Sequence, residues 1–141
     1  MSLRFLFDTS VISAPIAKSP DAKLVGRIED HAHEAAIAST VWHELIYGVS
    51  RLPRGRRRDA LMDYVETVVG VTFPILPYDD KAAAWHARER ARLEKAGKPV
   101  PFADGQIASI AYANDLVLVT HNTKDFARYQ NMRLENWTGR R

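Results

Sequence analysis

Short apolar runs and longer amphipathic segments alternate along the whole chain. The runs typical of strands lie at residues 3–7, 35–38, 71–76, 116–120 and around 132–134. Helical spacing of apolar residues predicts helices from 20 to about 28, from 39 or 40 to 49, over 61–68, over 80–96 and over 104–114. This alternation is typical of an α/β domain. We therefore expect a central, mostly parallel sheet of about five strands flanked by helices.

Local residue choices refine the expected elements. Pro74 interrupts the 71–76 run, which predicts a strand at the sheet edge, whereas the apolar run 116–120 predicts a central strand buried on both faces. Ser39 or Thr40 is expected to cap the helix that follows the second strand. Gly97 is a candidate C-cap.

Composition limits the classes of protein that the sequence can represent. A length of 141 residues with 46% hydrophobic residues fits a single domain over residues 1–141. Because cysteine is absent, disulfides, cysteine zinc sites and iron–sulfur clusters are excluded, which leaves oxygen and imidazole ligands for any metal. No run of about 18 apolar residues and no signal-peptide pattern is present. We expect a soluble, cytoplasmic protein with no membrane association.

Three aspartates are expected to meet at one edge of the sheet. Asp8 ends the first strand, and Asp125 follows the fourth strand by five residues. Asp104 begins the helix that precedes the fourth strand, so the antiparallel run of that helix returns it to the same edge. Ligands of open α/β sheets bind beyond the carboxyl ends of the strands. If the first and fourth strands are neighbours, all three carboxylates share that crevice.

Glu44 is the fourth carboxylate, and it lies inside a helix. At about 100° per residue it falls on the flank of the apolar arc that includes Val41 and Leu45, with Gly48 one turn further along. Taken singly, each acid could be a cap, a turn residue or a surface group. Together, four like charges around one crevice favour a bound cation, and oxygen ligands favour Mg²⁺ or Mn²⁺. Thr120 offers a hydroxyl at this edge to orient water or an acid.

The basic residues are unevenly distributed. The net charge is +3, and five arginines crowd residues 51–58 around Pro53 and Gly55. This cluster can contact phosphates or form a solvated loop, and both interpretations remain open.

Four motifs give the chain a resemblance to a known family. They are Phe-Leu-Phe-Asp-Thr-Ser-Val-Ile-Ser (5–13), His-Glu-Leu-Ile-Tyr-Gly (43–48), Phe-Ala-Asp-Gly-Gln-Ile-Ala (102–108) and Leu-Val-Thr-His-Asn-Thr-Lys-Asp-Phe-Ala-Arg (118–128). With them the chain resembles the PIN-domain nucleases, and among these the VapC-type toxins of toxin–antitoxin pairs. The resemblance covers essentially the whole chain. It implies a three-layer α/β/α fold.

The resemblance also implies an activity and a set of site residues. The implied activity is an Mg²⁺- or Mn²⁺-dependent endoribonuclease that cleaves cellular RNA, with tRNA as one family-level target, and that a VapB-like antitoxin inhibits. Asp8, Glu44 and Asp104 correspond to metal-site acids, and the fourth family acid stands at Asn122 or at Asp125. We favour Asp125 for its charge and keep Asn122 as a neutral ligand or substrate contact. A homodimer is implied as well.

Three other functions compete with this interpretation. A phospho-acceptor domain would need paired acids after the first strand, but here Phe7 precedes a single Asp8. A non-catalytic RNA-binding module could use the arginine cluster, although it would not need the four acids. A nuclease of the same fold that acts on DNA, or in RNA processing without a toxin role, would share the metal chemistry.

Overall fold

A five-stranded sheet forms the centre of the fold. The computed structural model describes residues 2–138. The strands are β1 (Phe5–Phe7), β2 (Ala35–Ala38), β3 (Ile75–Leu76), β4 (Val117–Val119) and β5 (Leu134–Glu135), in the order β3-β2-β1-β4-β5. Every neighbouring pair is parallel, so the expected fold class is confirmed. Phe5, Leu6 and Phe7 pair with Val117, Leu118 and Val119, which makes β1 and β4 neighbours.

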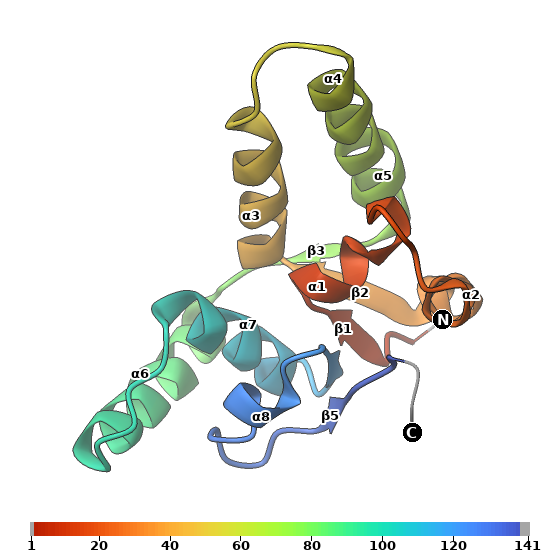
Figure 1. Cartoon of the computed structure of the whole chain (residues 1–141). Coiled ribbons are helices and arrows are strands. Elements are labelled where there is room, and N and C mark those ends of the chain that lie inside the picture. Colours follow the sequence, from red (N-terminus) through yellow and green to blue (C-terminus); the bar gives the residue numbers. More distant parts are fainter. Residues whose placement is uncertain (1, 139–141) are drawn as a thin grey trace.

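Helices cover both faces of the sheet (Figure 1). The α-helices are α1 (Thr9–Ile12), α2 (Ala22–His31), α3 (Ser39–Ser50), α4 (Arg56–Asp63), α5 (Gly70–Thr72), α6 (Asp80–Lys95), α7 (Phe102–Ala113) and α8 (Thr123–Phe126). Two 3₁₀ turns, η1 (Ala14–Ile16) and η2 (Ala32–Glu34), and a π-helical stretch, η3 (Tyr64–Val69), complete the set. No helix within residues 2–138 is both long and apolar enough to cross a membrane.

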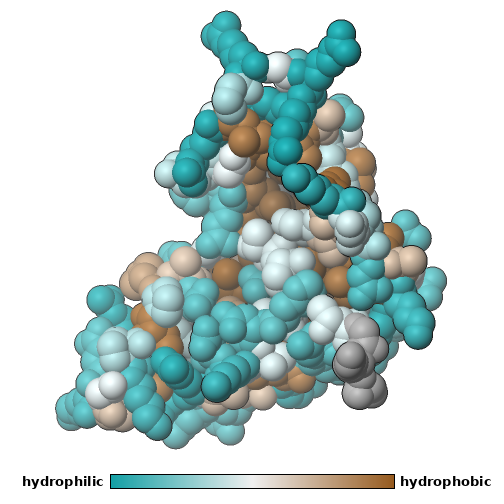
Figure 2. All heavy atoms as spheres, in the orientation of Figure 1, coloured by the Kyte–Doolittle hydropathy of each residue, from teal (hydrophilic) through white to brown (hydrophobic). Residues whose placement is uncertain are grey.

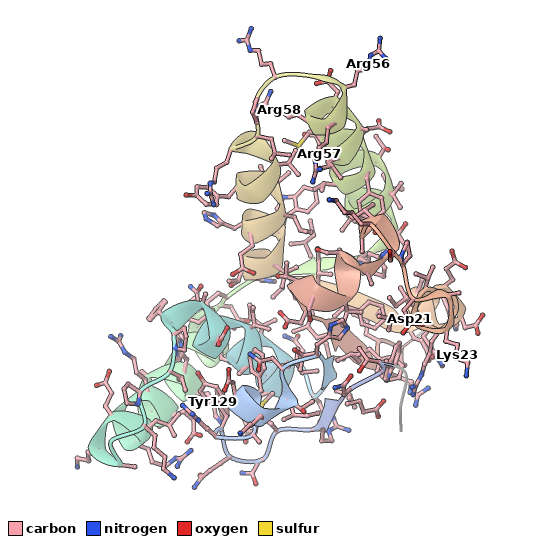
Figure 3. The ribbon with its side chains drawn as sticks, in the orientation of Figure 1. Asp21, Lys23, Arg56, Arg57, Arg58 and Tyr129 are labelled. Carbon is pink, nitrogen blue, oxygen red and sulfur yellow. The ribbon has the colours of Figure 1, made fainter. Side chains whose placement is uncertain are left out.

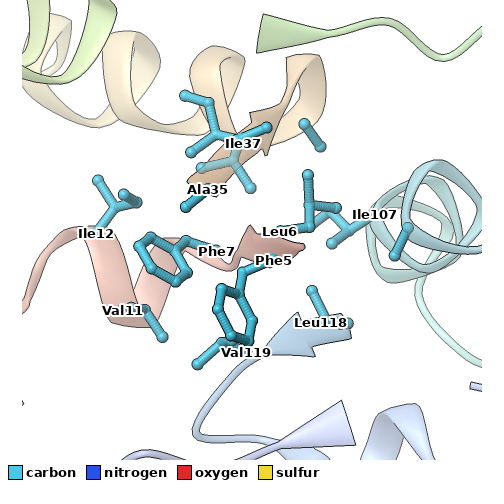
Figure 4. Packing of buried hydrophobic residues seen from close by; sticks show 14 of the residues in the cluster. Phe5, Leu6, Phe7, Val11, Ile12, Ala35, Ile37, Ile107, Leu118 and Val119 are labelled. Atoms are coloured by element: carbon cyan, nitrogen blue, oxygen red, sulfur yellow. The ribbon is translucent and has the colours of Figure 1, made fainter. Parts of the chain in front are cut away.

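The core forms where β1 is enclosed by its neighbours (Figure 4). Leu6 and Phe7 are completely buried, as are Ile37 on β2 and Leu118 on β4. Burying one such side chain stabilises the fold by about 1.5–3 kcal/mol. The strands whose ends carry Asp8 and Thr120 are therefore held by the buried core.

Helix α3 and the run α4–η3–α5 form a hairpin that extends beyond the sheet (Figure 1). Its tip is hydrophilic, with long polar side chains projecting from it (Figure 2). At its base, the Tyr64 hydroxyl donates a hydrogen bond of 2.9 Å to the carbonyl of Ile12. The hairpin is thus attached to α1, the helix that follows Asp8.

Several expected elements were wrong in detail. Residues 71–72 continue a helix, and only Ile75–Leu76 forms the strand, although its predicted edge position is confirmed. Neither Ser39 nor Thr40 caps α3: Ala38 is the N-cap residue, and the Thr40 hydroxyl instead donates to Gln106 Oε1 at 3.2 Å. Helix α7 begins at Phe102, two residues before the expected start.

Candidate active site

Asp8 lies where β1 ends, directly beside the end of β4. It is the N-cap of α1, and its Oδ1 accepts the Thr9 backbone N–H at 2.8 Å. Its Oδ2 accepts the hydroxyl of Thr120 at 2.7 Å, although 112 positions separate the two residues. Because β1 and β4 are adjacent, the carboxylate has both oxygens fixed before any ligand binds.

Glu44 reaches the same place from α3. Its Oε1 accepts the Thr9 hydroxyl at 2.6 Å, a short bond of the kind that an ionised acceptor makes. Thr9 therefore contacts two acids, Asp8 through its backbone N–H and Glu44 through its side chain. The expected position of Glu44 on the flank of the buried arc is confirmed, since it is partly buried between buried Val41 and Val49.

Asp104 shows that the four acids share one electrostatic environment. It is the third residue of α7 and partly buried. Burial raises the pKa of its carboxyl, and the charges of Asp8, Glu44 and Asp125 raise that pKa further. No hydrogen bond or ion pair of the Asp104 side chain occurs within residues 2–138. The structure thus brings together the acids that topology predicted.

Close packing fixes the position of α7 at Asp104. A Cβ atom at the next residue, Gly105, would lie 2.0 Å from His86 Nε2, so only glycine allows α7 to approach α6 this closely. His86 is buried, and its Nδ1 hydrogen-bonds the Tyr78 hydroxyl at 2.8 Å. Burial, with a smaller contribution from Arg90, lowers the His86 pKa and favours the neutral ring.

The two candidates for the fourth acid differ in placement. Asp125 lies in α8, a short helix that the sequence pattern did not indicate, and its charge contributes to the raised Asp104 pKa. Asn122 is exposed and precedes α8. Its backbone N–H donates to Thr120 Oγ1 at 3.0 Å, so Thr120 links Asn122 to Asp8. Thr120 itself is completely buried, which fits the orienting role expected for it.

Two features of the site were not expected. A hollow of about 740 Å³ adjoins Glu44 and is lined by residues from α3 and from the start of α7, including Tyr47, Phe102 and Gln106. The Tyr129 hydroxyl is buried with no hydrogen-bond partner among residues 2–138, and burial and the Asp104 charge raise its pKa. Neither follows from sequence spacing, because both depend on how α7 and the segment after α8 pack.

The charges of the acids influence one another, but their side chains are not placed as the complete ligand set of a metal ion. Within residues 2–138, no three His, Cys, Asp or Glu side chains are placed to hold a metal ion. The donor chemistry nevertheless fits a hard divalent cation, because burial and the charges of three other carboxylates raise the Asp104 pKa, and carboxylate oxygens are the ligands that such a cation prefers. The metal site stays a prediction at this stage.

Known proteins share both the sequence and the fold. The PIN domain family model matches residues 5–131. The tRNA(fMet)-specific endonuclease VapC of Shigella flexneri is 32% identical over 136 residues, which cover 96% of this chain and 99% of that protein. Toxin FitB of Neisseria gonorrhoeae is 32% identical over 86% of this chain and 89% of its own. The crystal structure of FitAcB from that organism has a TM-score of 0.88 at 28% identity, over 96% of this chain and 99% of that chain. The chain therefore belongs to the PIN domain family and is of the VapC type.

Proposed function

We propose that this protein is a divalent-metal-dependent endoribonuclease and the toxin of a toxin–antitoxin pair. The observation that carries the proposal is the convergence of four acids. Thr9 joins Asp8 and Glu44 by hydrogen bonds, and burial and then the charges of Asp8, Glu44 and Asp125 raise the pKa of Asp104. A site that gathers four acids opposes its own ionisation unless a cation is bound. Relatives whose names state endonuclease or toxin activity support the class of reaction.

Asp8, Glu44, Asp104 and Asp125 would hold the ion, Mg²⁺ or Mn²⁺, with Asn122 as the neutral alternative to Asp125. A divalent ion bound among carboxylates polarises a phosphodiester and lowers the pKa of bound water. Thr9 and Thr120 keep Asp8 and Glu44 oriented through their hydrogen bonds. Burial, and then the charges of the other three acids, raise the pKa of Asp104, so its carboxyl is protonated more easily than that of a free aspartate.

The activity can be tested with purified full-length protein and labelled RNA and DNA oligonucleotides of the same sequence. We expect RNA cleavage with Mg²⁺ or Mn²⁺, none with EDTA, and little or no cleavage of DNA. Asp8→Asn and Asp104→Asn should abolish cleavage, while Asp63→Asn, at an exposed position outside the site, should retain it. Cleavage that survives in EDTA or in Asp104→Asn would refute the proposed site.

The toxin role has a separate test in cells. Expression of the chain alone should arrest growth, and co-expression of the cognate VapB-like antitoxin should restore it. Sequencing of RNA 5′ ends after brief induction would identify the target; tRNA is the first candidate because the Shigella flexneri relative is named for it. We also propose a homodimer, which light scattering of the purified protein would test. Normal growth with soluble wild-type protein would contradict the toxin role.

A further inference from the structure

Side chains on α3 form a line from the acid cluster toward the tip of the hairpin. The His43 and Tyr47 rings are nearly parallel, with centroids 6.1 Å apart. The Arg51 guanidinium carbon lies 5.3 Å from the centre of the Tyr47 ring. All three side chains are exposed, and Tyr47 retains 57% of its accessible surface. Glu44 is the next residue after His43 on the same helix, so the line begins beside one of the acids and runs toward the tip.

The tip itself is strongly basic. It carries Arg51, Arg54, Arg56, Arg57 and Arg58. Figure 3 shows the last three around the α3–α4 turn. None of the five forms an ion pair with the acids in residues 2–138, and Arg58 Nε is buried without a hydrogen-bond partner there. Their positive charge is therefore available to an anionic partner.

The hollow beside Glu44 has aromatic side chains on two sides. Tyr47 comes from α3 and Phe102 from α7, and Phe102 retains 49% of its accessible surface. Thr40 and Gln106, which are hydrogen-bonded to each other, also line it. Exposed rings beside hydroxyl and amide groups are suited to stacking a base and hydrogen-bonding its edge.

We propose that this surface is the RNA-binding path of the enzyme. A single-stranded segment next to the scissile phosphate lies in the hollow, with a base stacked on Tyr47 and its neighbouring phosphates bound by the arginines of the tip. The proposal rests on the nuclease function proposed above and adds that the bound part of the substrate is single-stranded RNA. It also gives the arginine cluster the phosphate-binding role that the sequence alone left open.

Geometry and charge favour RNA over a protein segment in this hollow. An RNA strand whose phosphodiester is cleaved at the acid cluster must continue over the surface next to that cluster. The hollow is such a surface, because Glu44 is part of its lining. Glu44 lies in α3 and Arg51 is the C-cap residue of that helix, seven positions or roughly 10 Å further along its axis, which a few nucleotides can span. The lining mixes rings with carboxylate, hydroxyl and amide groups, and this combination suits a stacked base that is hydrogen-bonded at its edge.

Binding can be separated from cleavage in the Asp104→Asn background. Fluorescence anisotropy with a labelled single-stranded oligoribonucleotide, in EDTA, measures affinity without chemistry. Adding Tyr47→Ala should weaken binding roughly 5- to 100-fold through lost stacking, whereas Tyr47→Phe should retain it. Adding Arg54→Ala should weaken binding and lower the slope of log affinity against log salt by about 0.7, the value for one single-strand phosphate.

Matched controls lie on α6 and α7, outside the residues that line the hollow. Tyr112→Ala removes another exposed tyrosine, and Arg88→Ala another exposed arginine, and both should leave affinity unchanged. Unchanged RNA affinity in Tyr47→Ala and Arg54→Ala would overturn the proposed RNA-binding path, even if cleavage is normal. The same holds if these variants lose only antitoxin binding. Reduced RNA affinity would support the path even if the wild-type protein cleaves nothing, so the two proposals fail separately.

Discussion

The acid cluster has two halves that are built differently. Asp8 and Glu44 each accept hydrogen bonds from Thr9, and Asp8 also accepts one from Thr120. The side chains of Asp104 and Asp125 make no hydrogen bond or ion pair within residues 2–138. Burial and then the charges of the other three acids raise the Asp104 pKa. One half is therefore organised by the fold itself, while the other half is held only by its backbone. The first half should contribute to stability and the second should reduce it.

Replacing one acid of each half by alanine should give the largest difference between the two halves of the acid cluster. Asp8→Ala and Asp104→Ala should each lower kcat/KM for RNA by roughly 10³-fold, since each removes a charge expected to bind the ion. Their effects on metal-free stability should be opposite. Asp8→Ala loses an N-cap and the Thr120 bond, at a cost of about 1–3 kcal/mol, whereas Asp104→Ala removes repulsion and should raise Tm. Thermal unfolding in EDTA measures both, and a lower Tm for Asp104→Ala would show that its charge is not destabilising.

The next largest effect concerns the fourth acid. Asp125→Asn should lower cleavage by about 10- to 100-fold, because Asp125 contributes to the field at Asp104. Asn122→Ala should change cleavage by less than a few fold, because the Asn122 link to the site runs through its backbone N–H. Initial rates across a Mg²⁺ titration distinguish the two. The reverse order of effects would transfer the ligand role to Asn122.

Removing the hydroxyl of Thr9 or Thr120 tests how far Asp8 and Glu44 depend on these hydrogen bonds for their orientation. Thr9→Val and Thr120→Val should each reduce metal affinity or activity by about tenfold, as losses of groups that orient ligands commonly do. Thr67→Val is the control, because the exposed Thr67 hydroxyl bonds only the Asp63 carbonyl on the hairpin. Equal activity in all three variants would mean that Asp8 and Glu44 are oriented without these bonds.

The smallest expected effect is a pH dependence of stability. The folded pKa of Asp104 is raised, so the native state binds a proton more readily than the unfolded state does. Between the unfolded pKa near 3.9 and the raised folded value, this group therefore lowers stability as pH increases. In EDTA, the Tm advantage of Asp104→Asn over wild type should grow through that interval, by on the order of a few degrees. A difference that stays constant with pH would contradict the raised pKa.

The sequence predicts which acids converge better than it predicts the hydrogen bonds that orient them, and the reason is physical. Asp8, Asp104 and Asp125 converge because parallel strands end at one edge, a property that the element order already contains. The bond from Thr9 to Glu44 depends on side-chain placement across 35 positions, which no local pattern encodes. The Thr40 hydroxyl was expected to cap a helix but bonds Gln106, because a long-range partner replaced the local one.

Local propensity also failed where packing decided the structure. Val71 and Thr72 are β-branched, which favoured a strand, yet the Phe73 N–H bonds the Val69 carbonyl and the chain stays helical up to Thr72. The buried Val69 and Phe73 side chains hold this turn in place. Helix α8 has only four residues, too few for a periodic apolar pattern, so the sequence predicted no helix at Asp125.

The central place of β1 has a consequence for when the acid cluster is assembled during synthesis of the chain. Asp8 is among the first residues made, but the strand beside it, β4, ends at Val119, and Asp125 follows later still. A nascent chain that stops short of Asp125 has neither Thr120 next to Asp8 nor the complete set of acids. No nascent chain shorter than this therefore carries the complete acid cluster, although Asp8 is made first.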